Sequence, residues 1–420
     1  MTAELSPYTD VSPERWPDVA RVPDVPAKAR ITEAIVRQAV SGLPVRVSFP
    51  DGTTWGAGSA SAPEMLLVRP REFFSRLAAD FRSGFGEAYM AGDWVEGQHT
   101  DLADLLSPFA ARMASLVPRP LQAFRKLVDT AIPHSTRNTV EGSRDNIQAH
   151  YDLSNDLFAE FLDPTMTYSS AWFADEDDDL ERAQERKIDG MLDYARVGEG
   201  TRVLEIGTGW GALAIRAAAR GAQVVTITIS HEQAALAQER IDAAGLSDRV
   251  EVRLQDYREV TGEFDAILSV EMIEAVGEEY WPTYFSTIDR LLAPNGRVSI
   301  QAITMAHDRY LTTRRSYGWI QKYIFPGGLI PSLTAIDEVL AEHTDLYVQE
   351  RRDLGVHYAE TLRQWRARFE ERRGAVAQLG FDDVFHKMWR FYLAYCEAGF
   401  RTEYIGVSQL AIGRRPSFVG

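Results

Sequence analysis

The sequence predicts an α/β protein with a doubly wound, mostly parallel seven-stranded sheet, preceded by a smaller N-terminal α+β domain. The first observation is size, because 420 residues with 45% hydrophobic side chains exceed one ordinary domain and suffice for two hydrophobic cores. The second is an alternation of short apolar runs with helical patterns in the C-terminal part of the chain. The third is a separate group of short strand and helix signals near the N-terminus.

The alternation of strands and helices is the strongest of these signals. Five short apolar runs are predicted as strands, at residues 201–206, 223–228, 250–254, 266–270 and 297–303. Helical patterns at 212–220 and 231–244 separate the first three runs, which is typical of a parallel sheet. Later runs at 346–351 and 404–412 complete the seven strands.

The N-terminal part has a different pattern. It combines predicted helices and short strands, at residues 31–40, 45–49, 54–58, 65–68 and 70–81. Pro50-Asp51-Gly52 is a turn signal between the first two strands, and residues 84–94, dense in glycine and aromatic side chains, are predicted as a packed loop. The domains are therefore predicted as an arm at 1–27, an α+β domain at 28–131, a linker at 132–144 and the sheet domain at 145–420.

Composition restricts the classes of function. A formal charge of −16 disfavours nucleic acid as a partner, because the phosphate backbone attracts cationic proteins. The single cysteine, Cys396, excludes an intrachain disulfide, and the acidic run at 175–179 lacks the spacing of a calcium loop, so we predict no metal site. No apolar run approaches the roughly 20 residues of a membrane-spanning helix, and the first 50 residues do not resemble a secretion signal, so we expect a cytoplasmic protein.

A glycine-rich turn follows the first predicted strand of the sheet and contains Gly207, Gly209 and Gly211. Glycine lets the backbone turn sharply and approach a ligand closely. A dinucleotide site has the pattern G-x-G-x-x-G and an acidic residue about 20 positions further on, whereas this turn reads G-x-G-x-G and the second strand ends without a carboxylate. The pattern disfavours NAD and suits S-adenosylmethionine. Asp256 is predicted either to accept the adenine amino group or to be a turn residue.

Several segments together carry a family likeness, and their order and approximate spacing hold from about residue 145 to 412. They lie at residues 150–156 (HYDLSND), 166–169 (MTYS), 204–211, 228–233, 256–258, 274–277, 323–328 (YIFPGG) and 357–362. The chain thereby resembles the cyclopropane fatty acid synthase family, whose members transfer a methyl carbon from S-adenosylmethionine to an alkene of a lipid acyl chain. Residues 270–277, 301–305 and 394–401 are most similar to its tuberculostearic-acid branch, which methylates oleoyl phospholipid at C10.

The resemblance implies a class I methyltransferase sheet, a 10-methylene product, and a separate reductase that converts it to a 10-methyl chain. It also implies that the protein meets unsaturated phospholipid acyl chains at the inner face of the membrane, where it would bind peripherally. A homodimer is among the assemblies that the sequence leaves open.

The resemblance further implies which residues form the site. Those that match cofactor contacts are Tyr168, Ser169, Glu205, Gly207, Gly209, Gly211, Thr228, Ser230, Gln233, Asp256 and Tyr257. In the family, a bicarbonate ion is held by a main-chain group, a Glu, a His, a Tyr and a Cys. The matching catalytic positions are, in that order, Val270, Glu274, Gln301, Tyr358 and Ser170.

Ser170 and Gln301 depart from the family pattern. Both can donate hydrogen bonds to an anion, but neither is a base near neutral pH, so the base would be bicarbonate or Glu274. Loss of a proton from the new methyl group closes a cyclopropane ring, whereas loss after a hydride shift gives a methylene group. The position of the base decides between them, and only the branch similarity favours the methylene product.

Other interpretations stay open. The chain is alternatively a cyclopropane synthase, a methyltransferase of small soluble substrates, or a lipid-binding protein that has lost catalysis. Glu274 is alternatively a helix cap or the partner of an arginine, and Tyr358 a core residue. Residues 105–130, with four basic side chains against one acidic, are predicted either to dock on anionic lipid or to join the two domains.

Overall fold

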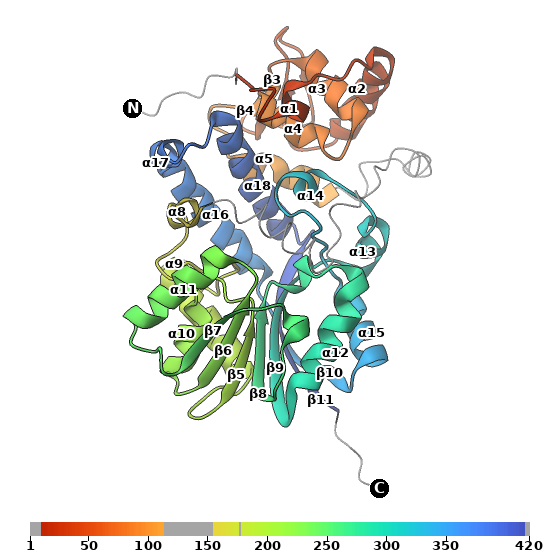
Figure 1. Ribbon diagram of the computed structural model, residues 1–420. Helices are drawn as coiled ribbons and strands as arrows, with labels where there is room; N and C mark the ends of the chain where they lie inside the picture. Colours follow the sequence, from red (N-terminus) through yellow and green to blue (C-terminus); the bar gives the residue numbers. More distant parts are fainter. Residues whose placement is uncertain (1–9, 113–153, 176–177, 416–420) are drawn as a thin grey trace. The chain divides into compact units, whose positions relative to one another are not determined.

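A computed structural model of the chain describes residues 10–112, 154–175 and 178–415 (Figure 1). The chain forms two compact units, which are described separately. The first comprises Met1–Ile132 together with two segments from much later in the sequence, Arg315–Ile324 and Phe369–Tyr404. The second comprises Pro133–Arg314, Phe325–Arg368 and Ile405–Gly420.

The second unit contains a seven-stranded sheet, which confirms the predicted fold class. Its strand order is β10-β11-β9-β8-β5-β6-β7. The five strands from β9 to β7 are parallel, and β11 pairs antiparallel with both β9 and β10. The strands are β5 (Arg202–Ile206), β6 (Gln223–Thr228), β7 (Val250–Leu254), β8 (Phe264–Val270), β9 (Leu292–Thr304), β10 (Leu346–Asp353) and β11 (Gly406–Arg414).

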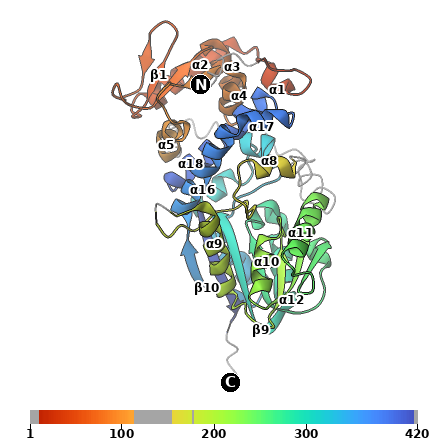
Figure 2. The ribbon, with the colours of Figure 1, turned by 90° about the vertical axis from the view of Figure 1, so that its left-hand side faces the viewer.

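Helices cover both faces of this sheet (Figures 1 and 2). One layer consists of α9 (Leu180–Tyr194), α10 (Ala212–Ala219) and α11 (His231–Ala243), and the other includes α12 (Trp281–Leu291) and α15 (Leu333–His343). Successive strand residues point to opposite faces, so buried Val203 packs with the first layer and buried Leu204 with the second. The remaining helices of this unit are α8 (Asn155–Ala159), η3 (Tyr257–Glu259), η4 (Ile273–Ala275), η5 (Glu278–Tyr280), α13 (His307–Thr313) and most of α16 (Gly355–Glu371).

The first unit has a small four-stranded sheet with the order β2-β1-β3-β4. Its strands are β1 (Arg46–Ser48), β2 (Thr54–Trp55), β3 (Glu64–Leu67) and β4 (Trp94–Glu96). Its helices are α1 (Pro17–Ala20), α2 (Pro26–Val40), α3 (Pro70–Ala79), α4 (Gly84–Ala91), α5 (Leu102–Arg112), α14 (Trp319–Tyr323), α17 (Arg373–Gln378) and α18 (Asp383–Arg401).

The loop prediction for residues 84–94 is wrong, because Gly84–Ala91 forms the helix α4. Burial outweighs the low helix propensity of its two glycines, since Tyr89 and Met90 lie in the core. Gly86 is needed for packing rather than for a turn. A Cβ atom at this position would lie 2.5 Å from the Trp319 ring of α14.

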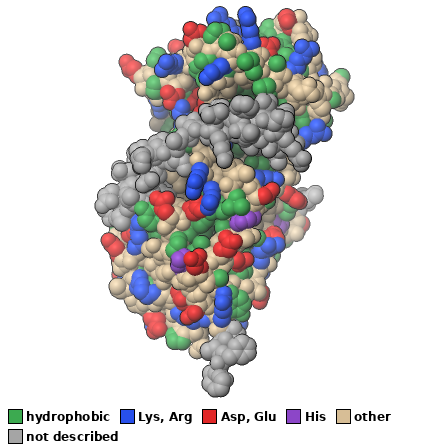
Figure 3. Space-filling view, turned by 90° about the vertical axis from the view of Figure 1, so that its right-hand side faces the viewer, with side chains coloured by type: hydrophobic (Ala, Val, Ile, Leu, Met, Phe, Trp, Pro, Cys, Tyr) green, Lys and Arg blue, Asp and Glu red, His purple; other side chains and the backbone are tan. Residues whose placement is uncertain are grey.

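The hypothesis of a lipid-docking segment at 105–130 falls largely outside the described residues, which end here at Arg112. Within α5, Leu105 and Leu106 are buried in the first unit, so these two side chains belong to its core. Within the described part of the chain, no helix is long and apolar enough to cross a bilayer. On the face drawn in Figure 3, acidic and basic side chains are interspersed with hydrophobic ones.

Candidate active site

The glycine-rich turn after β5 is open on the side where a ligand would lie. Gly207, Gly209 and Gly211 have φ angles of +99°, +52° and +87°, in the region that favours glycine. A Cβ atom on Gly209 would meet nothing within 4 Å, and one on Gly207 would meet only Met272, at 3.2 Å. The turn therefore leaves room for a ligand to contact its backbone.

Glu205 lies in β5 beneath this turn, and it is buried. Its Oε2 accepts a hydrogen bond of 2.6 Å from Thr226, whose hydroxyl is 2.8 Å from that of Thr208. Burial raises the pKa of Glu205 to about 8, against the lowering effects of Thr226 and Lys187. Glu205 thus links β5 to β6 as a buried acid, and its raised pKa favours the neutral form at pH 7.

Replacing Glu205 by glutamine should make stability less sensitive to pH. The folded pKa of Glu205, about 8, exceeds its ordinary value of 4.5, so its contribution to stability is present at low pH and is lost as the pH rises through 8. Between pH 5 and pH 9, the melting temperature of Glu205→Gln should fall less than that of the wild type. The control is Glu239→Gln on the exposed face of α11. Parallel curves for the wild type and Glu205→Gln would contradict the assignment.

The end of β6 provides polar groups but no carboxylate. Ser230 caps α11 by accepting from the backbone N–H of Gln233, whose side-chain Oε1 accepts a 2.8 Å hydrogen bond from Thr228. At the end of β7, Asp256 caps η3 and pairs with Arg258 through two hydrogen bonds, 2.8 and 2.6 Å long. Asp256 is thus a turn residue here, and its contact with adenine stays a prediction. The neighbouring Tyr257 is buried.

Tyr168 and Ser169 precede α9, and each of them contacts a residue of a helix. The Tyr168 ring contacts Trp365 of α16 at a centroid distance of 5.2 Å. The Ser169 hydroxyl accepts a 2.6 Å hydrogen bond from the ammonium group of Lys187, which is buried in α9. Burial lowers the pKa of Lys187 to about 8, opposed by the negative charges of Glu271 and other carboxyl groups.

A glutamate that the sequence analysis did not assign, Glu271, unites three predicted catalytic residues. Its Oε1 accepts hydrogen bonds from the Ser170 backbone N–H, at 2.9 Å, and from Gln301 Nε2, at 2.8 Å. Its Oε2 accepts a 2.7 Å hydrogen bond from the Tyr358 hydroxyl. Ser170, Gln301 and Tyr358 are all buried. The sequence did contain one signal for Glu271, because it is an acidic residue directly after the strand predicted at 266–270.

Glu274 is three residues further along, in η4. Its Oε1 accepts from the backbone N–H of Ile303, and its solvent-shielded Oε2 has no hydrogen-bond partner among the described residues. Burial of the carboxyl group, and then the charge of Glu271, raise the pKa of Glu274 to about 8. The Glu274 carboxyl group therefore accepts from a strand backbone, and neither alternative, a helix cap or an arginine partner, is seen among the described residues. Val270 ends β8 and pairs with Gln301 of β9.

The carboxylates and the glycine turn lie at neighbouring strand ends. β8 pairs with β5 in parallel, with Ser269 opposite Ile206, so the segment after Val270 emerges beside the turn. Met272 lies between Glu271 and Glu274 in the sequence. Its side chain lies 3.2 Å from the position that a Cβ atom on Gly207 would occupy. Ligands of doubly wound sheets bind at this edge, outside the carboxyl ends of the strands.

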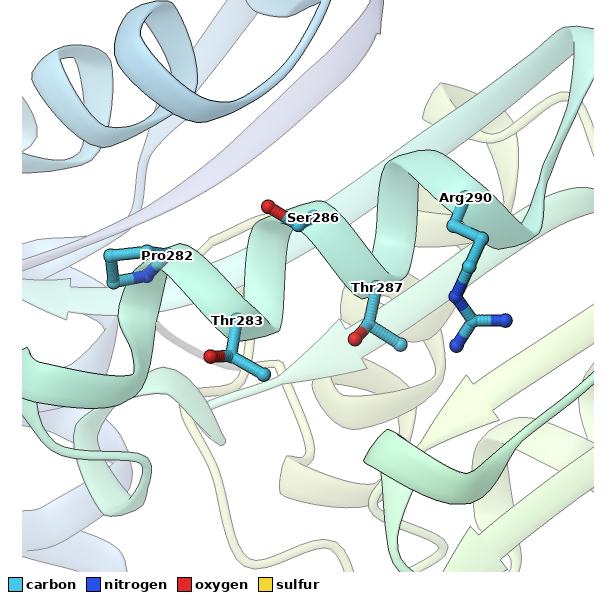
Figure 4. Close-up of a pocket in the computed structure, with 5 residues that line it drawn as sticks. All are labelled: Pro282, Thr283, Ser286, Thr287 and Arg290. Carbon is cyan, nitrogen blue, oxygen red and sulfur yellow. The ribbon is translucent and has the colours of Figure 1, made fainter.

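A separate hollow runs along α12 on the outer face of this unit (Figure 4). Its lining includes Pro282, Ser286 and Arg290, and none of the predicted site residues. Arg290 donates a 3.1 Å hydrogen bond to the Val260 carbonyl, so this cation already has a protein partner. The candidate active site is therefore placed at the carboxyl ends of the strands and not in this hollow.

The order of the seven strands and the glycine turn after β5 are those of a class I S-adenosylmethionine-dependent methyltransferase. Residues 138–410 match the family described as mycolic acid cyclopropane synthetase. The chain belongs to this family.

Individual relatives agree with this membership. The chain is 48% identical to the tuberculostearic acid methyltransferase UfaA1 of Mycobacterium tuberculosis over 99% of both chains. It is 34% identical to the cyclopropane-fatty-acyl-phospholipid synthase of Escherichia coli K12, over 85% of this chain and 89% of that one. The crystal structure of the mycolic acid cyclopropane synthase CmaA1 complexed with SAH and CTAB covers 67% of this chain and 98% of its own, with a TM-score of 0.59 and 32% identity.

Proposed function

We propose that this enzyme transfers the methyl carbon of S-adenosylmethionine to the cis double bond of an oleoyl chain in phospholipid. The product is a 10-methylene acyl chain, the precursor of a 10-methyl chain. The observation that carries the proposal is the pair of carboxyl groups, Glu271 and Glu274, beside the glycine turn. The likeness to UfaA1 over the full chain supports the choice of substrate and product.

The residues of the site suit a reaction that passes through a carbocation. S-adenosylmethionine, which the glycine turn and the end of β6 would hold, supplies a sulfonium methyl group as the electrophile. Because an isolated alkene is a weak nucleophile, the protein must hold it in line, and such positioning contributes roughly 7–11 kcal/mol. Attack leaves a positive charge on the acyl chain. Buried side chains such as Ser170 and Gln301 keep water away from it, and carboxyl oxygens stabilise it.

Cyclopropane formation is the second candidate, and the 34% identity to the Escherichia coli synthase favours it. Both reactions share the methyl transfer and the cation. In both, the new methyl group gives up the proton, and they differ in whether a hydride shift comes first, so the same residues serve either outcome. A separate reductase, which the 10-methyl product requires, is part of the first proposal alone.

The test is incubation of the full-length protein with S-adenosylmethionine and vesicles of dioleoyl phospholipid, followed by mass spectrometry of the lipid. We expect each modified chain to gain one CH₂. Vesicles of distearoyl phospholipid are the matched control, because they differ only in lacking the double bond, and should stay unmodified. An unchanged dioleoyl lipid in the presence of enzyme that binds the cofactor would refute the proposal.

A further inference from the structure

The hydrogen bonds of Glu271 are those of an anion held in place. Its two carboxylate oxygens accept from three donors, the Ser170 N–H, Gln301 Nε2 and the Tyr358 hydroxyl, at 2.7 to 2.9 Å. A carboxylate offers roughly four lone-pair sites, so this set leaves one on Oε2. Burial raises the pKa of Glu271, whereas the three donors and the charge of Lys187 oppose this rise and favour the ionised carboxylate.

These donors belong to residues that the family likeness assigns to bicarbonate. The Gln301 and Tyr358 side chains, which would have to hold the ion, are already bonded to Glu271. Ser170 donates its backbone N–H to Glu271, and its hydroxyl donates to the Ala171 carbonyl. A second anion at this place would also face the Glu271 carboxylate, and repulsion between like charges is strong in a poorly hydrated site. The residues present therefore do not fit a bicarbonate ion.

The backbone at Glu271 is in a conformation that a glutamate rarely adopts. Its φ angle is +50°, and its N–H donates a 2.7 Å hydrogen bond to the Gln301 carbonyl. Glycine would adopt this left-handed conformation without strain, whereas other residues pay about 1–2 kcal/mol. Strain of this kind persists where a side chain has a task that outweighs it. At position 271, the task is to place the carboxylate among the three donors.

The neighbouring Glu274 differs in its partners. It has a single backbone donor, Ile303, and its Oε2 has no partner among the described residues. Two carboxyl groups that share a site do not both ionise readily, and the charge goes to the one with more donors. The hydrogen-bond donors therefore favour the negative charge on Glu271 over Glu274, whose pKa is raised to about 8 by burial and by the charge of Glu271.

We infer that the Glu271 carboxylate is the built-in general base of this enzyme and takes the place of bicarbonate. The inference rests on the proposed function. After methyl transfer and a hydride shift, a C–H bond of the new methyl group breaks, its electron pair forms the C=C bond of the methylene group, and the proton goes to Glu271 Oε2. The resulting carboxylic acid then releases the proton to solvent before the next turnover. No further reactant is needed.

The first test measures turnover of dioleoyl phospholipid vesicles in buffer freed of carbon dioxide, with bicarbonate added back in steps. The wild type should be fully active without bicarbonate and unchanged by its addition. If the wild type is inactive at every bicarbonate concentration, the proposed function fails. If it modifies the lipid only when bicarbonate is present, the proposed function stands and this inference is overturned.

Two variants sharpen the test. Glu271→Gln keeps the shape of the side chain but cannot take a proton, so we expect at least a 100-fold loss of turnover with unchanged binding of S-adenosylhomocysteine by calorimetry. Glu271→Gly suits the backbone and frees the three donors, so bicarbonate should restore a measurable part of its activity. Full activity of Glu271→Gln would overturn the inference. So would Glu271→Gly that folds, binds S-adenosylhomocysteine and shows no response to bicarbonate.

Discussion

Gly209→Val is expected to weaken the binding of S-adenosylmethionine by about 100-fold or more, which corresponds to about 2.7 kcal/mol. A Cβ atom at Gly209 would point into space that is free of protein atoms within 4 Å, beside the turn where the ligand approaches the backbone. The valine side chain would occupy that space. Isothermal titration calorimetry with S-adenosylmethionine or S-adenosylhomocysteine measures the change.

Gly245→Val separates this effect from backbone strain. Gly245 follows α11 and has a φ angle of +68°, similar to the +52° of Gly209, and a Cβ atom there would also meet nothing within 4 Å. Both variants strain the backbone by a similar amount, but Gly245 is not part of the turn. Its variant should bind the cofactor like the wild type. Equal loss of affinity in both would show that the turn does not contact the ligand.

Glu274→Gln is expected to lower the rate of lipid methylation by at least about 100-fold, in the range typical for the loss of a group that stabilises charge in the transition state. The amide oxygen can still accept from the Ile303 N–H, so the loop should keep its structure. The change replaces the shielded Oε2, whose lone pairs can face the substrate cation even when it carries a proton, by an NH₂ group that has no lone pair to offer. Single-turnover assays with preformed enzyme–cofactor complex measure this step directly.

The matched control for this variant is Glu279→Gln, in η5 five residues further on, where the side chain is exposed. It makes the same change of residue type in the same stretch of chain without touching the site. Its rate should equal that of the wild type. A Glu274→Gln enzyme as fast as this control would show that Glu274 does not act on the cation.

The sequence was sufficient for the sheet because each strand is a short apolar run with helices between the runs. The strands β10 and β11 were also predicted, from the late apolar runs at 346–351 and 404–412, but their antiparallel pairing was not. The glycine turn could be found because positive φ angles at Gly207, Gly209 and Gly211 leave a direct trace in residue type. These features depend on local pattern, which a single sequence records.

Features that depend on tertiary contact could not be found in the same way. Glu271 has a φ angle of +50°, but because it is not a glycine, the sequence does not reveal this conformation. Its three hydrogen-bond donors come from positions 170, 301 and 358, which are far apart in the sequence. Nor does the sequence show that residues 84–91 form a helix, since this depends on burial against α14 and α18. The family pattern pointed to Ser170, Gln301 and Tyr358, which the structure brings together around Glu271, but it suggested bicarbonate and not a side chain as the anion they hold.

The most direct test of the central claim follows the transferred carbon itself. The enzyme is incubated with S-adenosylmethionine labelled with ¹³C in its methyl group and with dioleoyl phospholipid, and the extracted lipid is examined by ¹³C NMR. We predict that the label appears as the terminal carbon of a C=CH₂ group at C10 of the acyl chain. Label in a cyclopropane ring carbon would contradict the proposed product, and the absence of label from the lipid would contradict the proposed reaction.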